Sequence, residues 1–222
     1  MSVKTHAIAR LQAAHCAEAA ETLTRAFADD PIYTYVFPDS DTRLRATRRM
    51  WEALLAAGLR YGEVYTTPTR QGIACWMAPG RTEMTLVQQA RTGFGLVRAI
   101  FAFPAASRQR FYGIARYTDE LRRRDMQRPF WYLWVIGVDP ACQGQGIGSQ
   151  LMQPVLARAD AQGLPCYLET ETEDNVAFYE RRGFRVLRSG LAPGHPIHLW
   201  TMVRKPQPVG EGEPANPPTV GG

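Results

Sequence analysis

The stretch from Phe130 to Leu151 reads FWYLWVIGVDPACQGQGIGSQL, and the interpretation of the whole chain starts from it. Its first nine residues are nearly all apolar or aromatic, which is typical of a central strand buried on both faces. Glycines follow at positions 144, 146 and 148, and a helical pattern then runs to about Gln162. Glycine lets the backbone approach a bound group, and a helix N-terminus favours an anion. The stretch therefore predicts a strand, a phosphate-binding loop and a helix.

Two kinds of nucleotide loop fit these glycines poorly. A Walker A loop needs a lysine after its last glycine, and none is present. A dinucleotide loop needs GxGxxG, but Ser149 stands in place of the third glycine. Glu169 does lie about twenty residues further on, where a ribose-binding acid belongs, so this alternative stays open. The plainest alternative is a helix start without any ligand.

The remaining pattern indicates an α/β fold with a mixed central sheet flanked by helices. Residues 31–39, PIYTYVFPD, are expected to form a loop bracketed by prolines. Strands are expected at 5–11, 62–67, 72–79, 165–170, 184–190 and 198–205, and helices at 16–27, 41–60, 82–124 with a break at Phe103-Pro104, 147–162 and 175–183.

Length and composition are those of an ordinary globular domain. The 222 residues are 45% hydrophobic and 21% charged, with a net charge of +5. We expect one domain over residues 1–205, with a helical insertion at about 82–124. Residues 206–222 are almost entirely Pro, Gly and small polar residues, so we expect this tail to be disordered.

The cysteines and the charges bear on location and partners. Four widely spaced cysteines have neither metal-ligand nor CxxC spacing, so we expect reduced thiols, a cytoplasmic protein and no metal. No stretch has the length and apolarity of a membrane span. The arginines at 43–51 and 121–125 look like solvated helix faces without the aromatic residues of a nucleic-acid platform. We expect no nucleic-acid or membrane partner, and a monomer or homodimer.

The loop and two further segments resemble the GNAT superfamily of N-acetyltransferases. Gln143-x-x-Gly146-x-Gly148 matches that family's (Q/R)xxGxG/A signature, and VIGVDP matches the strand end before it. NVAFYERRGF, from Asn175 to Phe184, is similar to its second signature in shortened form. The similarity runs from about Ala26 to Pro206, is weak over 82–124, and is strongest to members that acetylate aminonucleoside antibiotics.

This resemblance implies a GNAT-like, mostly antiparallel sheet that splays open beside the strand preceding the glycine loop. It implies acetyl-CoA as cosubstrate, with the loop amides on the pyrophosphate and the pantetheine arm against the splayed strand. Asn175 would contact the arm, act as a helix N-cap, or do both. The implied cofactor-binding residues are Ile136, Gly137, Val138, Gln143, Gly144, Gln145, Gly146, Ile147, Gly148, Ser149 and Asn175.

The resemblance also implies direct transfer of an acetyl group to a primary amine. Tyr179 is either the acid that protonates the departing thiolate or a core aromatic residue. Glu169 is predicted as the base, with Glu171 on the same strand face as an equal candidate, and a structural carboxylate as the alternative. His195 and His198 are interpreted as turn or edge residues.

The acceptor is the least determined part of the resemblance. Tyr33, Tyr35, Phe37 and Trp76 are predicted to wall its pocket, although ordinary core aromatics would look the same. A small-molecule amine, such as an aminonucleoside antibiotic, is the first hypothesis, and a protein N-terminus or lysine is an alternative. A regulatory module that binds acyl-CoA without turnover is the rival from another class.

Overall fold

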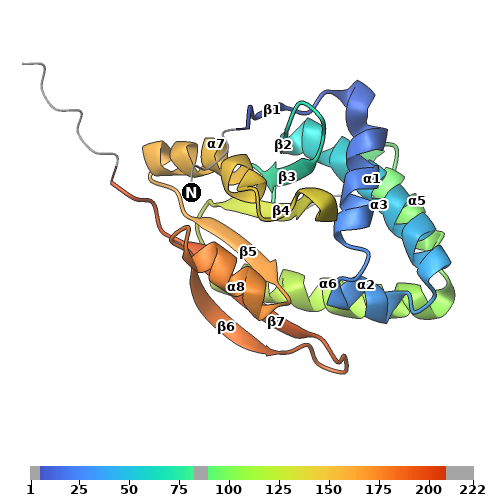
Figure 1. Ribbon diagram of the computed structural model, residues 1–222. Coiled ribbons are helices and arrows are strands. Elements are labelled where there is room, and N and C mark those ends of the chain that lie inside the picture. The colour runs from blue at the N-terminus through green and yellow to red at the C-terminus, as the bar shows by residue number, and fades with distance from the viewer. Residues whose placement is uncertain (1–5, 83–89, 209–222) are drawn as a thin grey trace, which may run out of the picture.

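The computed structural model describes residues 6–82 and 90–208, arranged as one twisted sheet with helices on both faces (Figure 1). The start of the predicted helical insertion and nearly all of the predicted tail lie outside these ranges. None of the helices in the described ranges has both the length and the apolarity needed to cross a bilayer.

The sheet contains seven strands in the described part of the chain, in the order β1-β2-β3-β4-β5-β7-β6. The pair β4–β5 is parallel and the other neighbouring pairs are antiparallel, which confirms the predicted mixed, mostly antiparallel sheet. The strands are β1 Ala9–Arg10, β2 Gly62–Thr66, β3 Gly72–Met77, β4 Trp131–Val138, β5 Cys166–Thr170, β6 Arg185–Leu191 and β7 His198–Arg204.

The sheet splits between its two central strands. The strands β4 and β5 pair only at Trp131↔Cys166 and Tyr132↔Tyr167. Beyond these residues, β4 continues to pair with β3 alone and β5 with β7 alone. The splay that the sequence resemblance implied is therefore present.

A β-bulge in β4 accompanies the split. Cys75 pairs with Val135 and Trp76 with Leu133, so Trp134 is an extra residue without a partner on β3. A bulge of this kind bends its strand and increases the local twist. It turns the far half of β4 relative to the near half, at the place where β5 parts from it.

Successive residues of a strand point to opposite faces of the sheet, so the sheet has an apolar core on each face. Helices cover both of these cores. Cys75 and Val135 pack with α1 and α3, whereas Trp76 and Leu133 pack with α7 and α8. The helices are α1 Cys16–Ala26, α2 Pro31–Val36, α3 Ser40–Tyr61, α5 Gly95–Phe101, α6 Ala105–Asp125, α7 Ile147–Gln162 and α8 Glu173–Glu180, with 3₁₀ turns η1 Ala13–His15 and η2 Pro140–Cys142.

The prediction of a loop at 31–39 is wrong, because helix α2 begins at Pro31. Asp30 caps this helix by accepting hydrogen bonds from Ile32 N at 2.9 Å and Tyr33 N at 3.2 Å. Pro31 does exclude continuation of α1, as predicted, but proline is also favoured at the first position of a new helix. A helix of six residues is too short to show a hydrophobic period.

Gly137 marks the close contact of β4 with α1 and generates a first prediction. A Cβ at this position would lie 2.9 Å from Leu23 Cδ2, 3.0 Å from Ala26 Cβ and 3.0 Å from Phe27 Cε2. Overpacking of a dense core costs about 1–3 kcal/mol. Gly137→Ala should lower the free energy of unfolding in urea by about that amount. Gly190→Ala, in β6 with nothing within 4 Å, is the control. Equal stability of the two variants would contradict the packing described here.

Candidate active site

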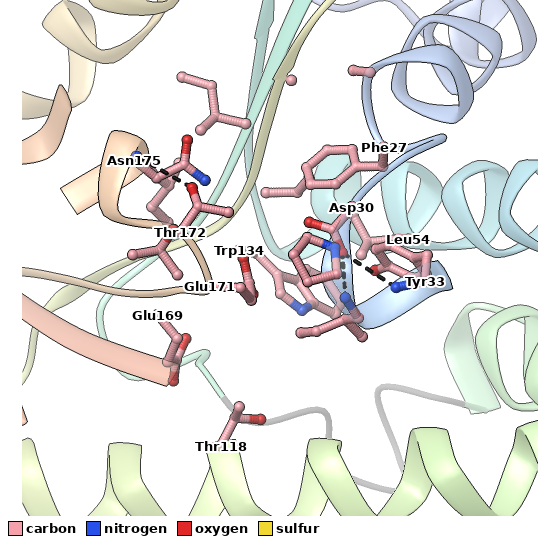
Figure 2. Close-up of a pocket in the computed structure, with 18 of the residues that line it drawn as sticks. Phe27, Asp30, Tyr33, Leu54, Thr118, Trp134, Glu169, Glu171, Thr172 and Asn175 are labelled. Carbon is pink, nitrogen blue, oxygen red and sulfur yellow. Dashed lines mark hydrogen bonds between the residues drawn. The ribbon is translucent and has the colours of Figure 1, made fainter. Parts of the chain in front are cut away.

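A large cavity opens where β4 and β5 separate. Its volume is about 2160 Å³, whereas a typical pocket for one small molecule holds about 300–1,000 Å³. The glycine loop and α8 form one end, and the α1–α2 connection and α6 form the other. Figure 2 shows side chains from both ends facing the same open space. The cavity has room for two molecules.

The glycine loop presents backbone N–H groups at one end of the cavity. Gly144 and Gly146 have φ values of 75° and 81°, in the left-handed region where glycine is favoured. Helix α7 begins without a side-chain cap. The N–H groups of Ile147, Gly148 and Ser149 have no partner within the helix and can bind an anion.

Arg182 adds a cation at this end, and the sequence analysis missed it. Its guanidinium donates to Ser149 Oγ in the first turn of α7 and lies 3.4 Å from the centre of the Phe178 ring. Its Nε is buried and has no hydrogen-bond partner among the described residues. Burial, followed by repulsion from Arg181, lowers the pKa of Arg182. In the sequence it is one of two adjacent arginines in a polar segment, which looks like surface.

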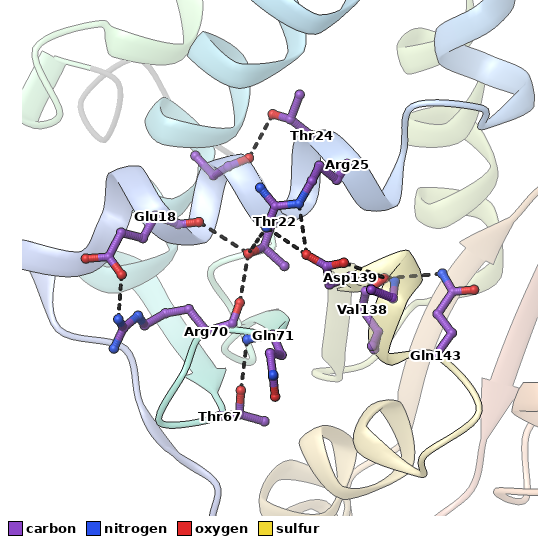
Figure 3. A network of polar contacts seen from close by, with 12 residues as sticks. Glu18, Thr22, Thr24, Arg25, Thr67, Arg70, Gln71, Val138, Asp139 and Gln143 are labelled. Carbon is purple, nitrogen blue, oxygen red and sulfur yellow. Dashed lines mark hydrogen bonds and ion pairs between the residues drawn. The ribbon is translucent and has the colours of Figure 1, made fainter.

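A polar network fixes the loop between strand and helix (Figure 3). Asp139 accepts from Arg25 Nε at 2.8 Å and from Ala141 N at 3.1 Å. Gln143 Nε2 donates to Val138 O at 3.2 Å. The side chain of Gln143 therefore stabilises the loop, and Gln143 lines the cavity.

The register of β4 decides which backbone groups face the split. Asp139 N donates to Gln71 O at 2.8 Å, so Asp139 bonds toward β3. Hydrogen-bonded residues alternate along an antiparallel strand. Gly137 therefore also faces β3, while the N–H and C=O groups of Ile136 and Val138 face the split. Gly137, predicted as a cofactor-binding residue, lines the cavity, but its backbone is paired with β3 and its Cα packs on α1.

Helix α8 carries two of the predicted residues. Its N-cap is Thr172, whose Oγ1 accepts from Asn175 N at 3.3 Å, so Asn175 is not the N-cap. Asn175 is exposed on the cavity wall (Figure 2). Tyr179 also lines the cavity, and its ring packs 5.1 Å from Phe178 and 5.8 Å from Phe184. Burial, followed by repulsion from Glu171, raises the pKa of Tyr179, which keeps its phenol protonated.

Three half-buried acidic residues face the cavity from two directions (Figure 2). Burial raises the pKa of Glu169 to about 7, against the attraction of Arg122. Burial and repulsion from Asp30 raise the pKa of Glu171. Burial raises the pKa of Asp30 to about 6, although Tyr33 and Ile32 donate to it. Asp30 was not predicted as a site residue; in the structure it caps α2, a helix that was itself not predicted.

The predicted aromatic wall is only partly correct. Tyr33 lines the cavity, with its ring 5.3 Å from that of Trp51. Trp76 is 0% exposed and Phe37 is 1% exposed; both pack in the core, so the prediction that they contact an acceptor is wrong.

Tyr35 does not line the cavity either. Its hydroxyl shares a 3.1 Å hydrogen bond with His195 Nδ1, and the imidazole of His195 does reach the cavity. Phe27 and Trp134 supply the aromatic surface that the sequence analysis assigned elsewhere. Trp134 lines the cavity because it is the extra residue of the β-bulge, and the regular alternation of a strand does not predict this orientation.

Comparisons with known proteins agree with this geometry. The family described as Acetyltransferase (GNAT) matches residues 70–184. An uncharacterised N-acetyltransferase of Schizosaccharomyces pombe is 30% identical over 219 residues, covering 94% of this chain and 87% of the relative.

Two solved structures share the fold. One is a histone acetyltransferase HPA2 and related acetyltransferase from Corynebacterium glutamicum, with a TM-score of 0.67, 21% identity, and coverage of 92% of this chain and 98% of that chain. The other is a putative acetyltransferase from Salmonella typhimurium with its cofactor acetyl-CoA, with a TM-score of 0.50, 18% identity, and coverage of 97% and 99%.

The ionisation of Glu169 generates a second prediction. Its pKa is about 7 in the fold, against an ordinary value of 4.5, so between these pH values the unfolded chain has lost a proton that the folded chain keeps. Stability therefore falls as pH rises through this window, by an amount on the order of 3 kcal/mol. Glu169→Gln cannot ionise.

Urea unfolding at pH 4.5 to 8 measures the effect. Relative to the wild type, Glu169→Gln should gain stability with rising pH up to about 7 and then level off. Glu180→Gln, on the exposed face of α8, is the surface control. A difference between Glu169→Gln and the wild type that stays constant with pH would show that Glu169 is not desolvated.

Proposed function

The chain belongs to the GNAT family of acetyltransferases and is an N-acetyltransferase that uses acetyl-CoA, and we propose that its acceptor is a primary amine of a small molecule. Membership rests on the family match and on the relative that covers nearly the whole chain. The acceptor class, the roles of single residues and the order of steps are the proposal.

One observation carries the proposal: the two ends of the cavity have opposite charge. The loop amides and Arg182 gather positive charge at one end. Asp30, Glu169 and Glu171 gather buried carboxyl groups at the other. Coenzyme A is anionic at its pyrophosphate, and an amine is cationic in water, so each end attracts one substrate. The thioester and the amine then meet between the ends, beside the split.

The split fits the pantetheine arm. Ile136 and Val138 have backbone groups facing an unpaired strand edge, and the amides of the arm can bond to them as an added strand would. The Val138 N–H is also placed to polarise the thioester carbonyl, because preorganised backbone donors stabilise a developing oxyanion.

Proton transfers then require one base and one acid near the same centre. Glu171 directly precedes Thr172, the N-cap of the helix that carries Tyr179, and repulsion from Glu171 adds to burial in raising the pKa of Tyr179. We therefore assign Glu171 as the base that takes the amine proton, directly or through water, and Tyr179 as the acid for the thiolate. The amine attacks the carbonyl carbon, the C–S bond breaks, and no acetylated enzyme forms. Glu169, the base predicted from sequence, takes part in acceptor binding in this assignment.

Release of free thiol from acetyl-CoA tests the function. The protein is incubated with acetyl-CoA and a panel of amines that includes alkylamines, aminonucleosides and lysine peptides. Amine-dependent thiol release and an acetylated product in mass spectrometry are expected. Tight acetyl-CoA binding without release on any amine would support the regulatory module instead.

Tyr179→Phe removes the proposed acid and keeps the packing ring. Proton donation is worth about 10²–10⁴-fold, and a thiolate is a fair leaving group, so kcat should fall by about 10². Coenzyme A affinity should change less, because one hydrogen bond is worth about 1 kcal/mol. Tyr167→Phe, which also removes a buried hydroxyl, should alter stability but not kcat. A Tyr179→Phe kcat within threefold of the wild type, with chemistry rate-limiting, removes Tyr179 from the mechanism.

Arg182→Gln removes the proposed phosphate contact. Charge-assisted hydrogen bonds contribute about 1.5–3 kcal/mol, so the dissociation constant of coenzyme A should rise about ten- to a hundredfold by calorimetry. Arg185→Gln, an exposed residue of β6, is the matched control. Equal affinities for the two variants would place the phosphates elsewhere.

Glu171→Gln and Glu169→Gln separate the two base candidates. The Glu171 variant should lose about 10²–10⁴ in kcat at pH 8, together with the acidic limb of the pH–rate profile. The Glu169 variant should mainly weaken the apparent affinity for the amine, seen as a higher KM. The opposite pattern would return the base role to Glu169.

A further inference from the structure

Glu169 has a carboxylate oxygen in the cavity that accepts no hydrogen bond. Its side chain is 8% exposed and lines the acceptor end, yet its Oε1 has no hydrogen-bond partner among the described residues. The cation of Arg122 is 3.8 Å away, beyond hydrogen-bonding distance. A buried carboxylate oxygen left without a donor costs free energy. The ligand of this cavity is therefore expected to supply that donor.

Asp30 and Glu171 also line the cavity, and Figure 2 shows their carboxyl groups facing the same open space as Glu169. Repulsion from Asp30, followed by repulsion from Glu169, adds to burial in raising the pKa of Glu171. Asp30 is held in place as the cap of α2. This pair fits the reacting amine.

Several carboxyl groups line the acceptor end of the cavity, and the guanidinium of Arg122 forms ion pairs with two of them, Asp119 and Glu169. These carboxyl groups belong to Asp30, Glu171, Glu169 and Asp119, and the buried guanidinium of Arg122 donates to Asp119. On the same helix, Arg116 pairs with Glu120 at 3.6 Å. Within residues 6–82 and 90–208, neither Asp30 nor Glu171 has an ion pair with a basic side chain. More than one carboxylate can therefore receive a cationic nitrogen from the ligand.

We propose that the acceptor is a short aliphatic diamine, with the reacting nitrogen at Asp30 and Glu171 and the second nitrogen, still protonated, at Glu169. This inference rests on the proposed function. The first nitrogen loses a proton to Glu171 and bonds to the acetyl carbon as the C–S bond breaks, and the thiolate takes the proton of Tyr179. The second nitrogen donates to Glu169 Oε1 throughout and stays unmodified.

The sequence separation of the two positions sets the length of the diamine. Glu169 lies in β5, Glu171 directly follows the last residue of that strand, and two residues of extended chain correspond to about 6–7 Å. An extended chain advances about 3.3–3.6 Å for every three bonds. A spacer of four or five carbon atoms between the nitrogens spans this distance. A spacer of three carbon atoms is too short for it, and one of six is too long.

A chain-length series tests the inference. Each diamine from 1,3-diaminopropane to 1,6-diaminohexane is compared at pH 8 with the n-alkylamine of equal length, by its specificity constant in thiol release and by mass spectrometry of the product. The wild type should prefer the diamine about ten- to a hundredfold, with the maximum at four or five carbons and a monoacetylated product. Glu169→Gln should reduce the diamine-to-monoamine ratio by most of that factor. Glu180→Gln should keep the wild-type ratio.

Calorimetry of 1,4-diaminobutane with the coenzyme A-bound protein gives a readout without turnover, and its affinity should also fall in Glu169→Gln. If the wild type acetylates monoamines and diamines with about equal specificity constants, the inference is overturned and the proposed function remains intact. A preference that survives Glu169→Gln would overturn it as well. If no diamine gives thiol release, the inference is overturned as well. Thiol release with the wider panel of amines then tests the proposed function separately.

Discussion

The incomplete pairing of β4 with β5 is the constraint on which the rest of the molecule depends. Two residue pairs join these strands, after which their facing edges are unpaired. Unsatisfied buried backbone groups each cost about 1–3 kcal/mol, so the split persists only because β3 and β7 hold the strands from outside. Helix α1 on Gly137 and the bulge at Trp134 fix the direction in which β4 leaves. An open edge of this kind is a binding site for an extended ligand.

The charge distribution follows from the same geometry. Helix α7 starts directly after the splayed strand, so its N-terminus lies at one mouth of the split, and Arg182 joins it there. The end of β5 brings Glu169 and Glu171 to the other side, where residues of α2 and α6 line the cavity. Desolvation raises the pKa of both carboxyl groups, which suits a group that must accept a proton from an amine. In the proposed function, the anionic coenzyme A and the cationic amine therefore bind on opposite sides of the split between β4 and β5.

The sequence predicted the elements whose signals are local and long. The apolar run of β4, the glycines before α7 and Gly163 at its end each have one straightforward interpretation, and the helix bounds 147–162 are confirmed. Glu169 and Glu171 both line the cavity, although β5 ends at Thr170 and so does not include Glu171. Helix α2 was missed because six residues carry no period, and Asp30 was missed with it because its position depends on the cap of that helix. Trp76 was predicted to wall the acceptor pocket, with a core position as the alternative, and the residues of α7 that pack on it bury it completely. Arg182 and Trp134 depend on tertiary contacts and on a bulge, which no short-range pattern encodes.

Residue-resolved hydrogen exchange of backbone amides, with and without coenzyme A, tests the central claim most directly. If the split receives the pantetheine arm, the amides of Ile136 and Val138 become protected on binding, together with those of the loop from Gly144 to Ser149. The amide of Gly137 should be protected already, because it faces β3, and should change little. Unchanged exchange at Ile136 and Val138 in the presence of saturating coenzyme A would contradict the account.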